Sequence, residues 1–146
     1  MKNEDLISEH CTYGEATISQ TAVLKHIDNT PTDEIIANMK LTAEKVFEPI
    51  RAHFGIPLTI SSFYRCPELN KAVGGVPDSQ HQYGQAIDIE MGWEMNLKIM
   101  AWAKDNLDYD QLLNEYPDED GRPRWVHISY VSPEKNRKEY LPIRLA

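Results

Sequence analysis

Two short segments alternate between apolar and polar residues, and this alternation constrains the fold more than any other feature of the sequence. In residues 86–91 (AIDIEM) the two isoleucines lie on one face and Asp88 on the other. In residues 125–130 (WVHISY) the valine, the isoleucine and the tyrosine share one face, and His127 lies on the other. Successive side chains of a β-strand point to opposite sides. The pattern therefore predicts two strands, each with an apolar face and an opposite face that carries Asp88 or His127.

A long amphipathic helix is predicted after Pro31, because apolar residues recur every three or four positions from Ile35 to Phe54. Gly55 is a typical residue for its end. Pro49 lies inside the pattern and lacks the amide hydrogen that a helix interior needs. We expect Pro49 to kink the helix or to split off its last turn.

The remaining elements complete an α+β fold, a small antiparallel sheet flanked by helices. Residues 110–116 and 125–130 are joined by the turn-rich segment PDEDGRPR, so they are expected to pair antiparallel. Thr12 and Glu15 have the spacing of a capping box, which favours a short helix there. The other expected elements are a strand at 58–63, a short helix at 67–73 and a second covering helix at 94–107.

Length and charge exclude several classes of protein. A chain of 146 residues supports one domain, which we place at 1–146. The formal net charge of -8, without a cluster of basic residues, argues against a nucleic-acid partner. No stretch approaches the roughly 20 apolar residues that span a bilayer, so no membrane association is expected, and we expect a monomer. The two cysteines, Cys11 and Cys66, are expected to be free thiols.

The first residues, MKNEDLISEH, are acidic and do not form the basic and then apolar pattern of a signal peptide. Two origins remain open for the chain. It is either the mature form of an exported protein, or it is made in the cytoplasm and released by a phage-type lysis pathway.

Three residues are candidate metal ligands: His81 in a polar loop, Asp88 on the following strand, and His127 on a late strand. Two imidazoles and one carboxylate are a typical donor set of catalytic zinc, which keeps a fourth position for water. A tight turn through Gly84 can bring His81 back over Asp88. His-x6-Asp alone is also compatible with a surface histidine and a capping aspartate.

The residues around these candidates resemble peptidase family M15, the zinc D-alanyl-D-alanine carboxypeptidases. The family pattern SxHxxGxAxD is matched at every defined position in the stretch SQHQYGQAID, residues 79–88. A histidine preceded by tryptophan follows in WVH, residues 125–127. The resemblance covers residues 58–130 and implies the fold that these peptidases share with the hedgehog signalling domain. It also implies that His81, Asp88 and His127 bind Zn2+.

The resemblance implies further roles in the site. Arg65 would bind a substrate carboxylate or steady the developing oxyanion, because its guanidinium donates two coplanar hydrogen bonds. Some members use the glutamate of a Glu-x-x-His arrangement as general base, but Arg124 stands at that position here. Glu115 is the candidate base instead, with Asp110 as the weaker alternative. Ser79 and Tyr83 complete the list: Ser79 is expected to orient the loop or a ligand, and Tyr83 could line the substrate cleft.

The resemblance therefore implies a zinc metallopeptidase that hydrolyses peptidoglycan stem peptides, either a carboxypeptidase or an endopeptidase. The small size also fits the catalytic domain of a phage lysin. A catalytically silent zinc-binding module that recognises a cell-wall fragment or a protein partner is the alternative, because one fold can serve several functions. A purely structural metal is a third possibility, and a chelator would then unfold the chain.

Overall fold

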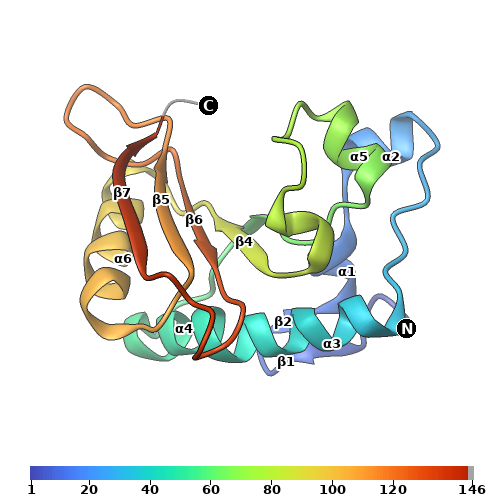
Figure 1. The fold of residues 1–146 in the computed structure, drawn as a ribbon, viewed down its shortest axis with the longest axis horizontal. Helices are drawn as coiled ribbons and strands as arrows, with labels where there is room; N and C mark the ends of the chain where they lie inside the picture. Colours follow the sequence, from blue (N-terminus) through green and yellow to red (C-terminus); the bar gives the residue numbers. More distant parts are fainter. Residues whose placement is uncertain (145–146) are drawn as a thin grey trace.

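A five-stranded sheet forms the centre of the computed structural model, which describes residues 1–144 (Figure 1). The strand order is β3-β4-β6-β5-β7. The first four of these strands pair antiparallel, as the sequence predicts. Flanking helices complete the α+β fold, so the predicted fold class is confirmed. The strands are β3 (Ile60–Ser62), β4 (Ala86–Ile89), β5 (Gln111–Glu115), β6 (Trp125–Ser129) and β7 (Glu139–Arg144).

Strand β7 is an element that the sequence pattern does not predict. It pairs with β5 in parallel, with Gln111 opposite Glu139 and Leu113 opposite Leu141. Its proline, Pro142, weakens any prediction of a strand, because proline cannot donate to a ladder of backbone hydrogen bonds. The structure accommodates Pro142 because β7 is an edge strand, with β5 as its partner on one side.

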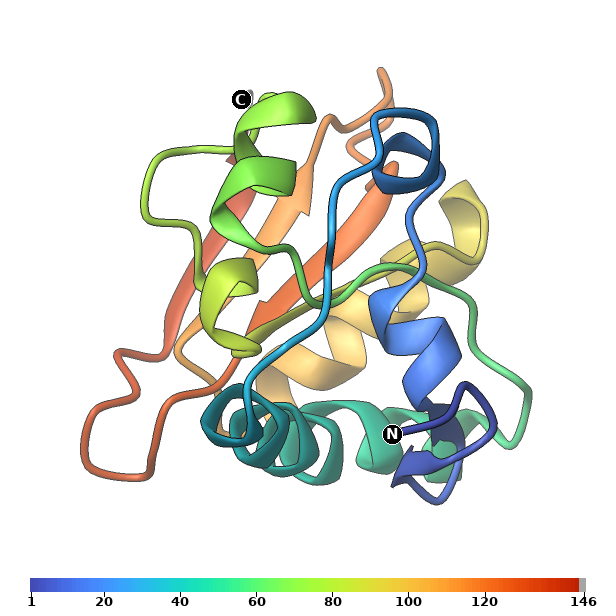
Figure 2. The ribbon, with the colours of Figure 1, turned by 90° about the vertical axis from the view of Figure 1, so that its right-hand side faces the viewer.

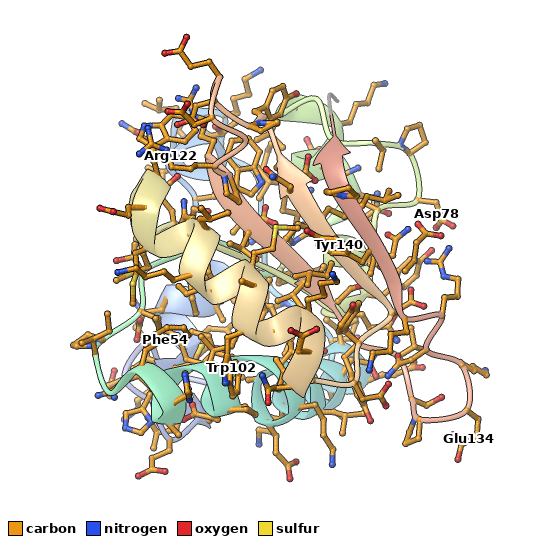
Figure 3. All side chains as sticks on the ribbon, turned by 90° about the vertical axis from the view of Figure 1, so that its left-hand side faces the viewer. Phe54, Asp78, Trp102, Arg122, Glu134 and Tyr140 are labelled. Atoms are coloured by element: carbon orange, nitrogen blue, oxygen red, sulfur yellow. The ribbon has the colours of Figure 1, made fainter. Side chains whose placement is uncertain are left out.

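One face of the sheet packs against helices and forms the core. Helix α6 (Trp93–Asn106) runs along this face, and the helical segment that begins with α3 (Asp33–Thr42) crosses one end of it (Figure 1). At the outer rim of the core, the rings of Phe54 and Trp102 meet edge to face with centroids 6.2 Å apart (Figure 3). The buried core includes Phe47, Ile50, Ile87, Ile89, Ile99, Leu112, Val126 and Ile128.

The long helix is interrupted near Pro49, as predicted, but the break lies earlier than its last turn. Between α3 and α4 (Glu48–Phe54), residues Ala43–Phe47 form a π-helical turn in which the Glu48 amide donates to the Ala43 carbonyl. Pro49 lacks an amide hydrogen and cannot continue the regular i to i−4 ladder. The wider turn just before Pro49 is the local response. Gly55 ends α4 in the left-handed conformation, as expected.

The opposite side of the structure is built from short elements at the N-terminus and in the middle of the chain (Figure 2). The predicted capping box of Thr12 and Glu15 is present, and both cysteines are free thiols. Burial raises the pKa of the Cys11 thiol to about 12. No helix in residues 1–144 has the length and apolar character needed to cross a membrane. The elements are β1 (Leu6–Ser8), β2 (Cys11–Thr12), α1 (Tyr13–Thr17), α2 (Gln20–Leu24), α5 (Pro67–Ala72) and the 3-10 helix η2 (Gln80–Tyr83).

Candidate metal centre and substrate cleft

A cleft of about 510 Å³ lies over the sheet face that points away from α6. Asp88, Leu113, Glu115 and His127 come from the three central strands and line this cleft. They share one face because side chains alternate along each strand and the strands are in register, with Asp88 opposite His127 and His127 opposite Leu113. The predicted separation of an apolar face and a polar face is confirmed.

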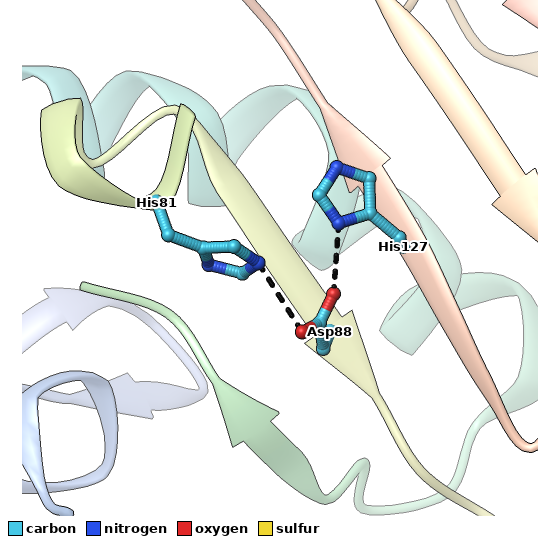
Figure 4. Close-up of side chains that lie close together, drawn as sticks. All are labelled: His81, Asp88 and His127. Carbon is cyan, nitrogen blue, oxygen red and sulfur yellow. Dashed lines mark hydrogen bonds and ion pairs between the residues drawn. The ribbon is translucent and has the colours of Figure 1, made fainter. Parts of the chain in front are cut away.

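His81, Asp88 and His127 meet in this cleft (Figure 4). His81 Nε2 lies 3.2 Å from Asp88 Oδ2, and His127 Nδ1 lies 3.0 Å from Asp88 Oδ1. One potential ligand atom from each side chain lies within 4.8 Å of the other two, and all three residues are buried. Three donor atoms of these types and at this spacing fit a single divalent cation of the zinc type.

A backbone carbonyl fixes the orientation of the His81 ring. Its Nδ1 lies 2.7 Å from the carbonyl oxygen of Phe63, which can only accept, so Nδ1 carries the proton and donates. Nε2 is then the basic nitrogen, and among residues 1–144 it has no hydrogen-bond partner although it is buried. A backbone carbonyl behind a ligating imidazole commonly selects the tautomer in metal sites. The tautomer of His81 therefore leaves a basic nitrogen for a metal ion, which supports metal binding independently of the spacing of the three residues.

The charge of Asp88 is stabilised by its neighbours. Burial raises the pKa of this carboxyl, but the interactions with the neighbouring His81 and His127 lower it by more, so that the net pKa lies well below its usual range. Asp88 is thus an anion at neutral pH. A buried carboxylate beside two imidazoles gives the cluster the charge that a divalent cation requires.

Gly84 makes the turn that brings η2 back to strand β4. Its backbone is left-handed, with φ of +69°, and its carbonyl accepts from the hydroxyl of Thr42 at 2.9 Å. A Cβ at this position would lie 2.5 Å from Met39 Cγ and 3.0 Å from the carbonyl oxygen of Ile35. Both the backbone conformation and the close packing on α3 therefore require glycine.

Replacing Gly84 by alanine should lower the free energy of unfolding by about 2–4 kcal/mol, from the left-handed backbone and the steric overlap together. Gly55→Ala is the matched control, because Gly55 has nearly the same φ of +66° but no atom within 4 Å of the added Cβ. Chemical denaturation of both variants separates the two contributions. Equal losses in the two variants would show that packing against α3 contributes nothing.

Glu115 lies on β5, the strand that pairs with β6, which carries His127. It is opposite Trp125 in the β5-β6 pairing, so it is the diagonal neighbour of His127 on the same face. Diagonal pairs of this kind are about 7–8 Å apart. Glu115 is buried and lines the cleft. The hairpin brings it beside His127 in the way that its predicted role as general base requires, and that role stays a proposal.

Arg65 lies in the wall of the same cleft, just beyond β3. Its Nη2 is 3.4 Å from the Ser79 hydroxyl, and its amide donates to the carbonyl of His81 at 3.1 Å. Burial lowers the pKa of the Arg65 guanidinium, and the charges of Asp88 and Glu115 oppose that shift. The Arg65 guanidinium therefore interacts electrostatically with Asp88 and Glu115, two of the acids that line the cleft.

Ser79 and Tyr83 differ in how well the structure supports their predicted roles. The buried hydroxyl of Ser79 accepts from the His81 amide and so caps η2, while its predicted role towards a substrate stays a prediction. Tyr83 is exposed, and its hydroxyl donates to Asp78 at the cleft rim. Within residues 1–144 Tyr83 is not part of the cleft lining. The expectation that Tyr83 binds substrate therefore has no support from the geometry.

Asp110, the alternative base, has a different task. Its oxygens accept from Arg137 Nε at 2.9 Å and Arg137 Nη2 at 2.7 Å, and also from Gln80 Nε2 at 2.9 Å. These bonds hold the pKa of Asp110 down at about 2, although burial acts in the opposite direction. A carboxylate so strongly committed to donors is a poor proton acceptor, which argues against the alternative role of Asp110 as the base.

The Asp110 ion pair should make stability depend on pH in acid. The folded pKa is about 2 and the ordinary value 3.8, so the carboxylate stabilises the fold fully above pH 4 and loses this effect as pH falls towards 2. We expect Asp110→Asn to cost about 2 kcal/mol near neutrality and progressively less below pH 4. Urea titrations at several pH values measure the difference from the natural chain. A constant difference down to pH 2 would contradict the assignment.

Three features of the site were not expected from the sequence: the contact of Gln80 with Asp110, the place of Arg137 in the cleft wall, and the bond from His81 to Phe63. Arg137 belongs to the polar run PEKNRKE, in which no pattern distinguishes it from its neighbours. Only the position of Gln80, next to a candidate ligand, could have suggested a role.

Two imidazoles and a carboxylate gathered in a cleft, with a second acid and a guanidinium in its lining, are a donor set compatible with a metallopeptidase. A family model described as Peptidase M15 matches residues 9–129, which include all of these side chains. The chain therefore belongs to the peptidase M15 family, whose members are generally zinc-dependent hydrolases. A search of curated proteins found no match to this chain.

Proposed function

We propose that this protein is a zinc metallopeptidase that hydrolyses peptidoglycan stem peptides, as a D-Ala-D-Ala carboxypeptidase or as an endopeptidase. The observation that carries the proposal is the convergence of His81, Asp88 and His127 in one cleft, with one ligand atom from each within 4.8 Å of the others. Membership of the peptidase M15 family supports the same class of reaction.

His81 Nε2, an oxygen of Asp88 and His127 Nδ1 would hold the zinc ion. When bound, zinc supplies Lewis acidity, which polarises a carbonyl and makes water acidic enough to attack near neutral pH. The buried Nε2 of His81, which has no hydrogen-bond partner within residues 1–144, is the feature of the structure that favours this donor set.

Glu115 is the group that would move the proton. A general base has to come within hydrogen-bond reach of the attacking water, and its carboxylate then passes the proton to the leaving nitrogen. Glu115 lines the cleft from β5 and is diagonal to His127. This position replaces the glutamate of the Glu-x-x-His arrangement, where the chain has Arg124.

Arg65 would hold the substrate for attack. Its guanidinium reaches the cleft from the wall opposite β5, and Ser79 fixes one end of it. Nε of Arg65 is buried and has no hydrogen-bond partner in residues 1–144. A peptide carboxylate or a developing oxyanion could accept from this guanidinium in a charge-assisted hydrogen bond.

A digest of purified peptidoglycan by the zinc-loaded protein tests the proposal. We expect mass spectrometry to detect peptide fragments, whose new ends identify the cleaved bond, and a chelator to stop their release. Circular dichroism before and after chelation separates a catalytic metal from a structural one. The core packs on the other face of the sheet, so the secondary structure should persist without metal.

The same digest distinguishes the alternative of a silent zinc-binding module, which the Arg124 substitution of the expected glutamate favours. Protein with one zinc per chain that releases nothing from several wall chemistries, yet binds wall fragments, would support the module and refute the peptidase.

A further inference from the structure

Arg137 is a second permanent cation in the cleft, and it comes from the opposite edge of the sheet to Arg65. Arg65 follows edge strand β3, whereas Arg137 precedes edge strand β7, with β4, β6 and β5 between them. Both arginines line the cleft that contains His81, Asp88 and His127. Arg137 lies beyond residue 129, where the match to the family ends.

A buried carboxylate holds Arg137 in place. The Asp110 side chain is only 3% exposed, yet that of Arg137 is 54% exposed. Asp110 accepts from the backbone amide of Arg137 at 2.9 Å as well as from its Nε and Nη2. Fixing the backbone and the guanidinium together positions a long side chain that would otherwise sample many rotamers.

The hydrogen bonds to Asp110 involve the Nε–Nη2 edge of the Arg137 guanidinium and leave the Nη1–Nη2 edge without a partner in residues 1–144. Of the five N–H donors of arginine, the Nε hydrogen and one Nη2 hydrogen point to Asp110. Within residues 1–144, Nη1 has no hydrogen-bond partner. The end of the fork, formed by Nη1 and Nη2, therefore remains available for a second carboxylate in the coplanar two-bond arrangement.

The two arginines are tied to neighbouring residues of the segment that carries His81. Ser79 contacts Arg65, and Gln80 donates to Asp110, which in turn holds Arg137. Both guanidinium groups are thus positioned relative to the same metal-ligand segment. A substrate bound at the candidate metal centre would lie between two fixed cations on opposite edges of the sheet.

We propose that Arg137 binds a second carboxylate of the substrate, distinct from the one bound by Arg65, so that the protein prefers acidic peptides with two carboxylates. The inference rests on the proposed peptidase function, because it assumes a peptide in this cleft. The protein carries a net charge of -8, which repels an acidic peptide at a distance. Inside the cleft, whose lining also includes Asp78, Asp88 and Glu115, Arg65 and Arg137 each offer a carboxylate of the peptide a local cationic partner.

Calorimetric titration with synthetic stem-type peptides tests this inference. The zinc-loaded Glu115→Gln chain is used as the background, so that the peptides stay intact. Three pentapeptides, L-Ala-γ-D-Glu-L-Lys-D-Ala-D-Ala and its two forms with one carboxylate amidated, are compared. We expect Arg137→Gln to weaken binding of the unmodified peptide about tenfold, the effect of losing charge-assisted hydrogen bonds at a partly exposed site. For one of the two amidated peptides, Arg137→Gln and the background protein should bind with equal affinity.

The matched control is Arg122→Gln. Arg122 is also paired with an aspartate, with its Nε 2.7 Å from Asp118 Oδ2, but in residues 1–144 it does not line the cleft. The affinity of the Arg122→Gln variant for the unmodified peptide should stay within about twofold of that of the background protein. Arg137→Lys is a second variant that keeps a cation beside Asp110 but lacks the fork, and it should weaken binding as Arg137→Gln does.

Three results would overturn the inference: no weakening in either Arg137 variant, equal weakening for all three peptides, or no binding of any peptide by the background protein. Hydrolysis by the unsubstituted zinc-loaded protein is measured separately. Peptide cleavage with no effect of Arg137 would refute this inference alone, whereas carboxylate-dependent binding without cleavage would refute the proposed reaction alone.

Discussion

Replacing Glu115 by glutamine is expected to lower kcat for peptide hydrolysis by about 10²- to 10⁴-fold, the usual contribution of a general acid–base group. Glutamine has nearly the same shape as glutamate and cannot take a proton from water. Glu115 is not among the three clustered donors, so the zinc content should stay at one ion per chain. Initial rates and metal analysis of the purified variant measure both quantities.

Glu90→Gln is the control for this experiment. Glu90 follows β4 and accepts a hydrogen bond from Asn96 at 3.3 Å, but within residues 1–144 it is not part of the cleft lining. Its removal should leave kcat unchanged. Hydrolysis that proceeds equally well with Glu115→Gln would disprove the proposed proton transfer and leave the peptidase assignment intact.

Replacing His81 by glutamine should abolish both zinc binding and activity. The substitution keeps much of the side-chain volume but removes the Nε2 that faces Asp88 and the Nδ1 that donates to Phe63. Loss of an outer-shell partner of a ligand alone costs about 10- to 100-fold in metal affinity. Loss of the ligand itself should therefore exceed about 100-fold. Competition with a chromogenic chelator measures the affinity.

His53→Gln is the matched histidine control. His53 stacks on Trp102 with ring centroids 4.3 Å apart, and it is not part of the His81, Asp88 and His127 cluster. Zinc affinity and activity should stay unchanged in this variant. Undiminished zinc binding by His81→Gln, in protein with a normal circular dichroism spectrum, would show that the ion is held elsewhere.

The sequence by itself determined which side chains share a face. Alternation along a strand is local, so the pattern in residues 86–91 predicted that Asp88 points away from the isoleucines, and the same reasoning applied to His127. Glycine and proline also act locally, which explains why the end of the helix at Gly55 and the break near Pro49 could be anticipated. The family pattern added the expectation that His81 joins the other two residues.

The tertiary structure alone decided the pairing of distant segments. Parallel pairing of β7 with β5 joins segments separated by a long connection. The entropic cost of closing that connection and the free energy gained by pairing depend on partners that no local pattern identifies. The same pairing brings Arg137 to Asp110, so that the Asp110 carboxylate accepts two hydrogen bonds from the Arg137 guanidinium. The sequence alone does not distinguish a carboxylate that acts as a general base from one that pairs with an arginine. Its role follows from the donors that surround it, and these come from all parts of the chain.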